Sequence, residues 1–166
     1  MMTNNKKLAK TSSTPGKTQL INHFLINKEW YLVDLPGYGY AKASKKDRNT
    51  WTGFLSDYLQ KRENLVCTFV LIDSRHEPQK IDLEFMYNLA VHQLPFVIIF
   101  TKIDKISKKQ LIINIEIYFK EMLKTWASVP SHFTSSANSK SGKDEILEYI
   151  GELNNSEAAN YIRDKK

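Results

Sequence analysis

Four residues after an apolar run carry groups that suit recognition of a guanine base. Thr101-Lys102-Ile103-Asp104 directly follows the apolar residues 95–100. A carboxylate at this point can accept two hydrogen bonds, from the N1–H and the exocyclic amine of guanine, a donor pair that adenine lacks. The aliphatic stem of the lysine can lie across the base while its ammonium group stays in water. A charged loop that merely closes a strand is the competing interpretation, because four-residue matches are common.

A second segment, Asp34-Leu35-Pro36-Gly37, also comes directly after a predicted strand. Asp34 can hold Mg²⁺ through a water molecule, and the backbone N–H of Gly37 can approach a terminal phosphate. An ordinary turn is the alternative. Because the two segments occur in this order and both at strand ends, together they favour a nucleotide site over two unrelated loops.

A third segment is the serine-rich loop that follows the predicted short strand 131–134. Backbone amides of Ser135-Ser136-Ala137 can donate to the guanine O6 and reject the amine of adenine. A loop without a ligand is the default explanation of this segment taken alone.

Gly16-Lys17-Thr18 looks like the end of a phosphate-binding P-loop, G-x-x-x-x-G-K-[ST], but its context is wrong. The first glycine of that pattern would fall at Thr11, and no apolar strand precedes the segment. We interpret it as a loop whose Thr18 hydroxyl coordinates Mg²⁺ when a triphosphate orders it.

Apolar periodicity predicts the elements that position these loops. Strands are expected at 19–26, 30–35, 65–72, 95–100 and 131–134, and helices at about 44–62, 80–92, 108–126 and 143–153. The first two strands, joined by the short turn 27–29, predict a hairpin. The alternation of strands and helices that follows predicts an α/β fold with a largely parallel sheet, in which ligands bind at the carboxyl ends of the strands.

Composition narrows the class of protein. The chain has 166 residues, 42% of them hydrophobic, which suffices for one domain with one core. The single cysteine, Cys67, excludes a disulfide framework and a multi-cysteine metal site and suits a cytoplasmic protein. No apolar run is long enough to span a bilayer, and no signal peptide opens the chain. A net charge of +6 is compatible with an anionic partner.

The motifs together resemble the EngB (YsxC/YihA) family of bacterial P-loop GTPases. The resemblance rests on Thr-Pro-Gly-Lys-Thr-Gln at 14–19, Asp-Leu-Pro-Gly-Tyr-Gly-Tyr-Ala at 34–41, Asp-Ser-Arg-His at 73–76, Thr-Lys-Ile-Asp at 101–104 and Ser-Ser at 135–136. It implies a three-layer P-loop-NTPase-type sandwich, with a G domain over 1–153 and a polar tail over 154–166. It further implies binding of GTP and GDP, Mg²⁺ as cofactor, a role in assembly of the large ribosomal subunit, contact with its rRNA, and an association with cell division and septation. Neither a membrane nor DNA is an expected partner.

The resemblance also implies roles for single residues. Thr18 is expected to bind Mg²⁺ directly and Asp34 through water, while Lys102 and Asp104 read guanine. The nucleotide-binding set that it implies is Gly16, Lys17, Thr18, Gln19, Asp34, Leu35, Pro36, Gly37, Thr101, Lys102, Ile103, Asp104, Thr134, Ser135 and Ser136. Many small GTPases carry a glutamine just after D-x-x-G that orients the attacking water, and here Tyr38 and Gly39 follow instead. We therefore expect slow hydrolysis and assign no catalytic residue.

One departure from the family is large. The strand and G-x-x-x-x-G-K-S loop that precede the basic segment in the family do not occur in the 166 residues, so we expect a truncated version of a longer protein. Loss of those donors would weaken nucleotide binding by several kcal/mol, at roughly 1.5–3 kcal/mol per charge-assisted bond. The rival hypothesis is a ribosome- or RNA-binding module that has lost nucleotide binding. Asp-Ser-Arg-His at 73–76 is either a contact to a switch loop or RNA, or a salt-bridge cluster.

Overall fold

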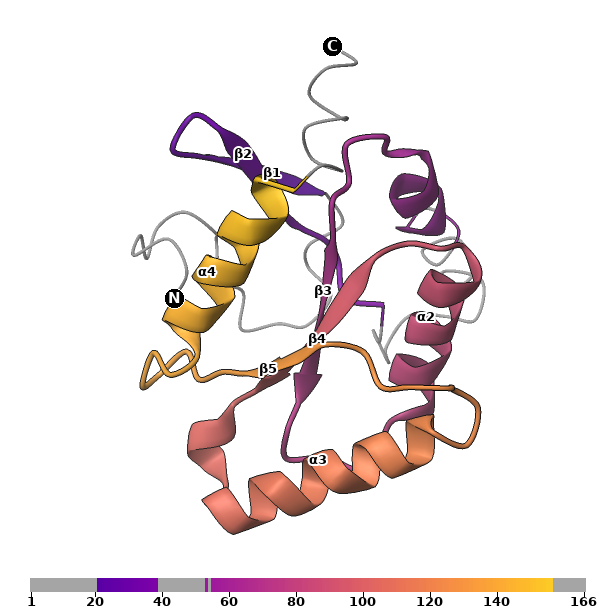
Figure 1. Ribbon diagram of the computed structural model, residues 1–166, viewed down its shortest axis with the longest axis vertical. Coiled ribbons are helices and arrows are strands. Elements are labelled where there is room, and N and C mark those ends of the chain that lie inside the picture. The colour runs from indigo at the N-terminus through magenta and orange to yellow at the C-terminus, as the bar shows by residue number, and fades with distance from the viewer. Residues whose placement is uncertain (1–20, 39–52, 54, 157–166) are drawn as a thin grey trace. The chain divides into compact units, whose positions relative to one another are not determined.

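The computed structural model describes residues 21–38, 53 and 55–156 (Figure 1). The chain divides into two compact units, Met1–Glu63 and Asn64–Lys166, and each is treated by itself. Residues 14–19, the first part of the predicted helix 44–62 and the tail beyond 156 lie outside the described residues.

The first unit contains the predicted hairpin. Strands β1 (Asn22–Ile26) and β2 (Trp30–Asp34) pair antiparallel, with Asn22 opposite Asp34 and Ile26 opposite Trp30. The loop between them turns because Asn27 and Lys28 both have positive φ, 50° and 62°, and the Glu29 amide donates to the Ile26 carbonyl at 2.9 Å. Consecutive residues with positive φ match the right-handed twist of a hairpin. This confirms the hairpin.

Residues 55–61 of the first unit are helical and form the described end of the helix predicted at 44–62. Its apolar side is buried, with Leu55 and Leu59 at 5% and 2% exposure. Tyr58 links this helix to the hairpin, because its hydroxyl lies 3.0 Å from Nε2 of His23 on β1.

The second unit is built on a parallel sheet in the order β3-β4-β5. The strands are β3 (Thr68–Asp73), β4 (Phe96–Thr101) and β5 (His132–Thr134), and both pairs are parallel. Helix α2 (Lys80–Val91) connects β3 to β4, and the short 3₁₀ helix η1 (Ile103–Lys105) with α3 (Lys108–Met122) connects β4 to β5. Helix α4 (Lys143–Asn154) follows β5. The predicted α/β fold with a largely parallel sheet is confirmed.

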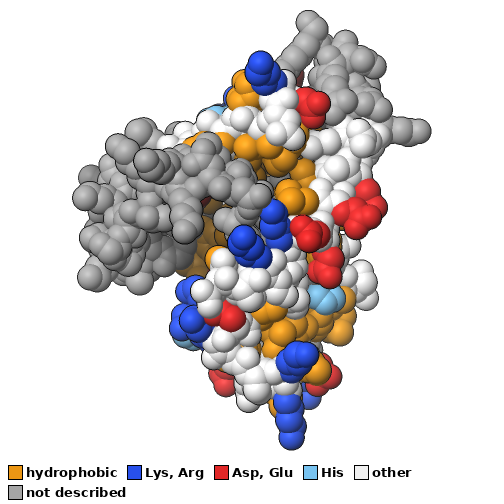
Figure 2. All heavy atoms as spheres, turned by 90° about the vertical axis from the view of Figure 1, so that its left-hand side faces the viewer, with side chains coloured by type: hydrophobic (Ala, Val, Ile, Leu, Met, Phe, Trp, Pro, Cys, Tyr) orange, Lys and Arg blue, Asp and Glu red, His pale blue; other side chains and the backbone are white. Residues whose placement is uncertain are grey.

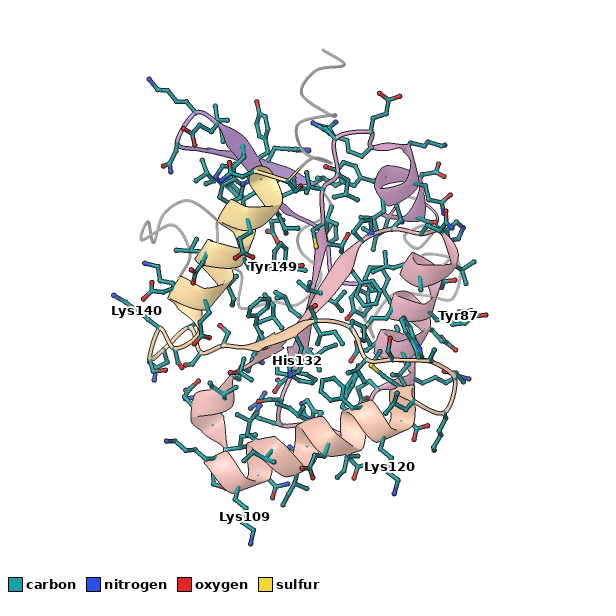
Figure 3. The ribbon with its side chains drawn as sticks, in the orientation of Figure 1. Tyr87, Lys109, Lys120, His132, Lys140 and Tyr149 are labelled. Carbon is teal, nitrogen blue, oxygen red and sulfur yellow. The ribbon has the colours of Figure 1, made fainter. Side chains whose placement is uncertain are left out.

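Helices cover both faces of this sheet (Figure 1). On one face Phe100 of β4 packs edge-on against Tyr118 and Phe119 of α3, with ring centroids 5.4 and 5.8 Å apart. On the other face Phe69 of β3 and Phe133 of β5 contact Tyr149 of α4, at 6.4 and 5.1 Å. Figure 3 shows Tyr149 directed from α4 towards the sheet. These aromatic contacts hold three layers together around a core.

Three details differ from the sequence-based expectation. The strand predicted at 65–72 as buried on both faces begins only at Thr68, and Leu71 is 62% exposed. On this face, among the described residues, α4 makes ring contacts with Phe69 and Phe133. The helix predicted to reach Trp126 ends at Met122, and Ile81 of α2 is exposed, whereas Met86 and Leu89 of the same helix are buried.

None of the helices in the described part of the chain is long and apolar enough to cross a bilayer. On the face that Figure 2 shows, lysine and arginine side chains are interspersed with acidic ones.

Candidate functional site

Two of the predicted segments meet at the carboxyl end of the parallel sheet. Phe100 of β4 lies opposite Thr134 of β5, so the loops that follow these strands leave the sheet side by side. Two backbone hydrogen bonds join the loops: the Ser135 amide donates to the Phe100 carbonyl at 2.8 Å, and the Ile103 amide donates to the Ser135 carbonyl at 3.4 Å. The structure thus brings 101–104 and 134–136 together, as the position of ligand sites in α/β sheets predicts.

Asp104 of η1 is the acidic group of this site, and Ser136 holds it. The Ser136 hydroxyl donates to Oδ1 of Asp104 at 2.7 Å, and Lys105 Nζ lies 3.1 Å from Oδ2. The hydrogen bond from Ser136, followed by the one from Lys105, lowers the pKa of Asp104 below its ordinary value. The carboxylate is therefore ionised at neutral pH. A carboxylate has two oxygens and about four lone-pair positions, so Asp104 can accept from a ligand as well as from Ser136 and Lys105.

Ser136 is fully buried and its hydroxyl organises the loop that follows β5. The hydroxyl oxygen accepts hydrogen bonds from the amides of Asn138 and Ser139, at 3.2 and 3.1 Å, while it donates to Asp104. The loop thereby wraps around one side chain and fixes the position of the carboxylate.

The backbone amides of this loop are not equally available. The Ser135 amide donates to Phe100, and the Ser136 amide donates to the Ser141 carbonyl at 3.1 Å. Within the described part of the chain, the amide of the exposed Ala137 donates to no backbone carbonyl. Of the three amides it is therefore the one that is not used in joining the loops.

Lys102 stands beside Asp104 in an unusual backbone conformation, with φ 61° and ψ 29° in the left-handed region. Such a conformation costs a non-glycine residue about 1–3 kcal/mol and clusters at functional sites. Its ammonium group lies 2.8 Å from Oδ2 of Asp73, at the end of the neighbouring strand β3. Thr101 closes the same edge of the sheet, because its hydroxyl donates to the Ile72 carbonyl at 2.9 Å.

The segment Asp-Ser-Arg-His at 73–76 forms a salt-bridge cluster that reaches Lys102. Arg75 binds Asp73 with two nitrogens, Nε to Oδ1 at 2.9 Å and Nη2 to Oδ2 at 2.7 Å. These bonds, and then those of Lys102, hold the pKa of the Asp73 carboxyl well below its usual range against the opposing effect of burial. The sequence left open whether this segment binds a partner or forms a cluster; the structure shows the cluster.

Gly142 is a site residue that sequence reasoning passed over as a helix start. Its φ is 72°, and a Cβ added to it would lie 1.8 Å from the Thr134 carbonyl oxygen. The loop can return against the end of β5 only because this position carries no side chain. The signal in the sequence was a glycine directly before a helix whose first turn is acidic, with Asp144 and Glu145.

The remaining predicted site residues belong to the first unit. Asp34 is the exposed last residue of β2, and Leu35, Pro36 and Gly37 follow it without regular structure. Gly16, Lys17, Thr18 and Gln19 lie outside the described residues. Among the described residues no group of three or more His, Cys, Asp or Glu side chains could hold a metal ion.

Comparison with known proteins agrees with this architecture. Residues 1–102 match the model of a family described as 50S ribosome-binding GTPase. A protein of Christiangramia forsetii named "Probable GTP-binding protein EngB" is 58% identical over 94% of this chain and 79% of its own length. A protein of the same name from Flavobacterium johnsoniae is 57% identical over 93% of this chain and 74% of its own length.

The chain belongs to the EngB family. Solved structures support the fold independently of this high identity. A crystal structure of a probable GTP-binding protein engB superposes with a TM-score of 0.61 at 19% identity, over 80% of each chain. The apo elongation factor SelB of Methanococcus maripaludis superposes with a TM-score of 0.58 at 21% identity, over 77% of this chain and 26% of SelB. The EngB motifs thus lie on a GTPase-type α/β fold.

Proposed function

We propose that this chain is a GTP-binding switch of the EngB type that reads guanine with the loops after β4 and β5. The observation that carries the proposal is the 2.7 Å hydrogen bond from Ser136 to Asp104, which fixes an ionised carboxylate at the carboxyl end of the parallel sheet. The N1–H and exocyclic amine of guanine supply the two matching donors, whereas adenine supplies no such pair. The Ala137 amide then faces O6, and the stem of Lys102 lies along the base.

The family motifs at 16–19 and 34–37 are the segments that we propose bind the phosphates. Asp34 suits Mg²⁺, because it is an exposed carboxylate and hard oxygen donors are what this ion prefers. Thr18 would bind the ion directly and Asp34 through water; when bound, Mg²⁺ neutralises phosphate charge. A Cβ on Gly37 would meet no atom of the described residues within 4 Å, whereas close approach of a phosphate to the backbone would favour a glycine there.

Hydrolysis of GTP is expected to be slow. The residues after Gly37 are Tyr38 and Gly39, so the glutamine that orients the attacking water in many small GTPases is not at this place, and a partner or another residue would have to supply that group. The proposed cellular role is assembly of the large ribosomal subunit in the cytoplasm, with rRNA as a contact and an effect on cell division and septation. The name of the matching family, 50S ribosome-binding GTPase, and the net charge of +6 support this role.

A titration with GDP, GTP and ATP tests the proposal. We expect guanine-selective binding, and we expect Asp104→Asn to lose it because an amide presents an N–H to the N1–H of guanine. The same variant should gain affinity for xanthosine diphosphate, whose O2 accepts that N–H. Asp57→Asn is the matched control, since Asp57 forms an exposed salt bridge with Lys61 at 2.9 Å far from these loops in sequence. Equal binding of GDP and ADP by the unaltered chain would refute guanine recognition.

The alternative function is a ribosome- or RNA-binding module without nucleotide binding. It is favoured by one observation, the net charge of +6, which suits an anionic RNA surface. In that case RNA binding is sensitive to salt and indifferent to GDP and GTP, and Asp104→Asn changes nothing.

A further inference from the structure

The salt-bridge cluster at the end of β3 contacts the proposed guanine site through the side chain of Lys102. Asp73 at the end of β3 is paired with Thr101 at the end of β4. Lys102 is the next residue after Thr101, so its backbone lies close to Asp73. The left-handed backbone of Lys102 turns its side chain back over the end of β3, where the ammonium group meets Oδ2 of Asp73 at 2.8 Å.

We propose that Asp73, itself held by Arg75, is a positioning residue that fixes the Lys102 stem in the orientation in which it covers a guanine base. This inference rests on the function proposed above and adds to it a residue outside the loops that touch the base. The guanidinium group of Arg75 donates two hydrogen bonds to the Asp73 carboxylate, and the backbone amide of Arg75 donates a third to Oδ1 at 3.2 Å.

The geometry favours positioning over simple neutralisation of charge. The Asp73 side chain is only 21% exposed, whereas that of Lys102 is 54% exposed. The carboxylate is thus the more enclosed partner, and the lysine is the more exposed one. A hydrogen bond to α3 also holds the turn that contains the cluster, because the side-chain amide of Asn114 donates to the Ser74 carbonyl at 2.8 Å. A lysine without this anchor samples many rotamers, and binding a base against its stem would then cost conformational entropy.

A double-mutant cycle separates positioning from a general structural effect. Lys102→Met keeps an unbranched apolar stem but removes the ammonium group that Asp73 holds. The four proteins, unaltered, Asp73→Asn, Lys102→Met and the double variant, are titrated with GDP and, as reference, ADP. Binding is followed by NMR of the ¹⁵N-labelled amides of residues 102 and 136, which reports weak affinities as well as strong ones. Asp57→Asn again serves as the matched control.

We expect Asp73→Asn to weaken GDP binding about two- to tenfold, the range for immobilising one flexible side chain. We expect no further loss when Asp73→Asn is added to Lys102→Met, because nothing is left to position. Urea unfolding of all four proteins reports the structural cost separately. The same loss of affinity in both backgrounds, or no loss in either, overturns the positioning role and leaves the proposed function standing. Absence of guanine-selective binding by the unaltered chain overturns both.

Discussion

At the scale of single residues, the side chain of Ser136 connects the two loops of the site by hydrogen bonds. One buried hydroxyl donates to Asp104 and accepts from two backbone amides, so Ser136→Ala leaves two amides and a carboxylate oxygen without this partner. We expect the free energy of unfolding to fall by about 1–3 kcal/mol, the cost of unsatisfied buried polar groups, and guanine affinity to fall with it. Urea unfolding and GDP titration check both. Ser139→Ala is the control, since Ser139 is exposed and its hydroxyl accepts one long hydrogen bond, at 3.4 Å, from the Ser141 amide. Equal losses in both variants would contradict the special role of Ser136.

Alkylation of Cys67 reports on burial of its thiol, and the signal is unambiguous because Cys67 is the only cysteine in the sequence. Burial raises the pKa of its thiol to about 11, above the value of about 8.5 for an unfolded chain. Because the folded protein holds the thiol proton more tightly than the unfolded chain, the protonated thiol contributes fully to the free energy of unfolding below about pH 8.5. This contribution is lost as the pH rises through 11. We expect alkylation by iodoacetamide at pH 8.5 to be on the order of a hundredfold slower in the folded protein than in urea, because the thiolate reacts. Similar rates in both states would show that the thiol is not protected.

At the scale of elements, the corner between β5 and α4 depends on the close approach at Gly142. A Cβ there would collide with the Thr134 backbone and would also occupy a left-handed conformation. We expect Gly142→Ala to cost about 1–3 kcal/mol from the backbone conformation alone, and more from the collision. Gly151→Ala is the control, because Gly151 lies in α4 and a Cβ there would meet no atom of the described residues within 4 Å. Thermal unfolding should separate the two variants by several degrees; coincident midpoints would contradict the packing argument.

The elements were more predictable from sequence than the contacts that join them. Strict local signals, such as the turn chemistry around Asn27 and the apolar run before Thr101, predicted the hairpin, the parallel strands and the joined loops. The exposure of Leu71 was not predictable, because it depends on how far a helix from another part of the chain reaches over the sheet. The pairing of Lys102 with Asp73 was missed for the same reason, since 29 residues and the register of two strands separate them.

At the scale of the whole molecule, the positive net charge predicts attraction to RNA, and the position of the basic residues decides whether one surface is used. The chain carries 24 basic and 18 acidic residues, and the basic ones cluster in sequence at Lys42, Lys45, Lys46 and Arg48, where Asp47 is the single acid. Any protein of this charge binds an RNA surface more tightly as salt is lowered, because phosphate contacts release counterions. Net charge therefore predicts salt dependence without telling which surface is used.

Two triple variants of equal charge separate these cases. One replaces Lys42, Lys45 and Lys46 by glutamate, and the other replaces Lys108, Lys109 and Lys120; Lys109 and Lys120 project from α3 away from the sheet (Figure 3). Each replacement changes the charge by two, so both variants are neutral overall. Co-sedimentation with purified 50S subunits across a series of KCl concentrations gives the slope of log affinity against log salt. If the cluster at 42–48 faces rRNA, the first variant loses affinity and its slope becomes shallower by about one for each phosphate contact removed, while the second keeps the original slope. If net charge alone governs association, the two variants weaken equally, and the cluster has no special part in binding.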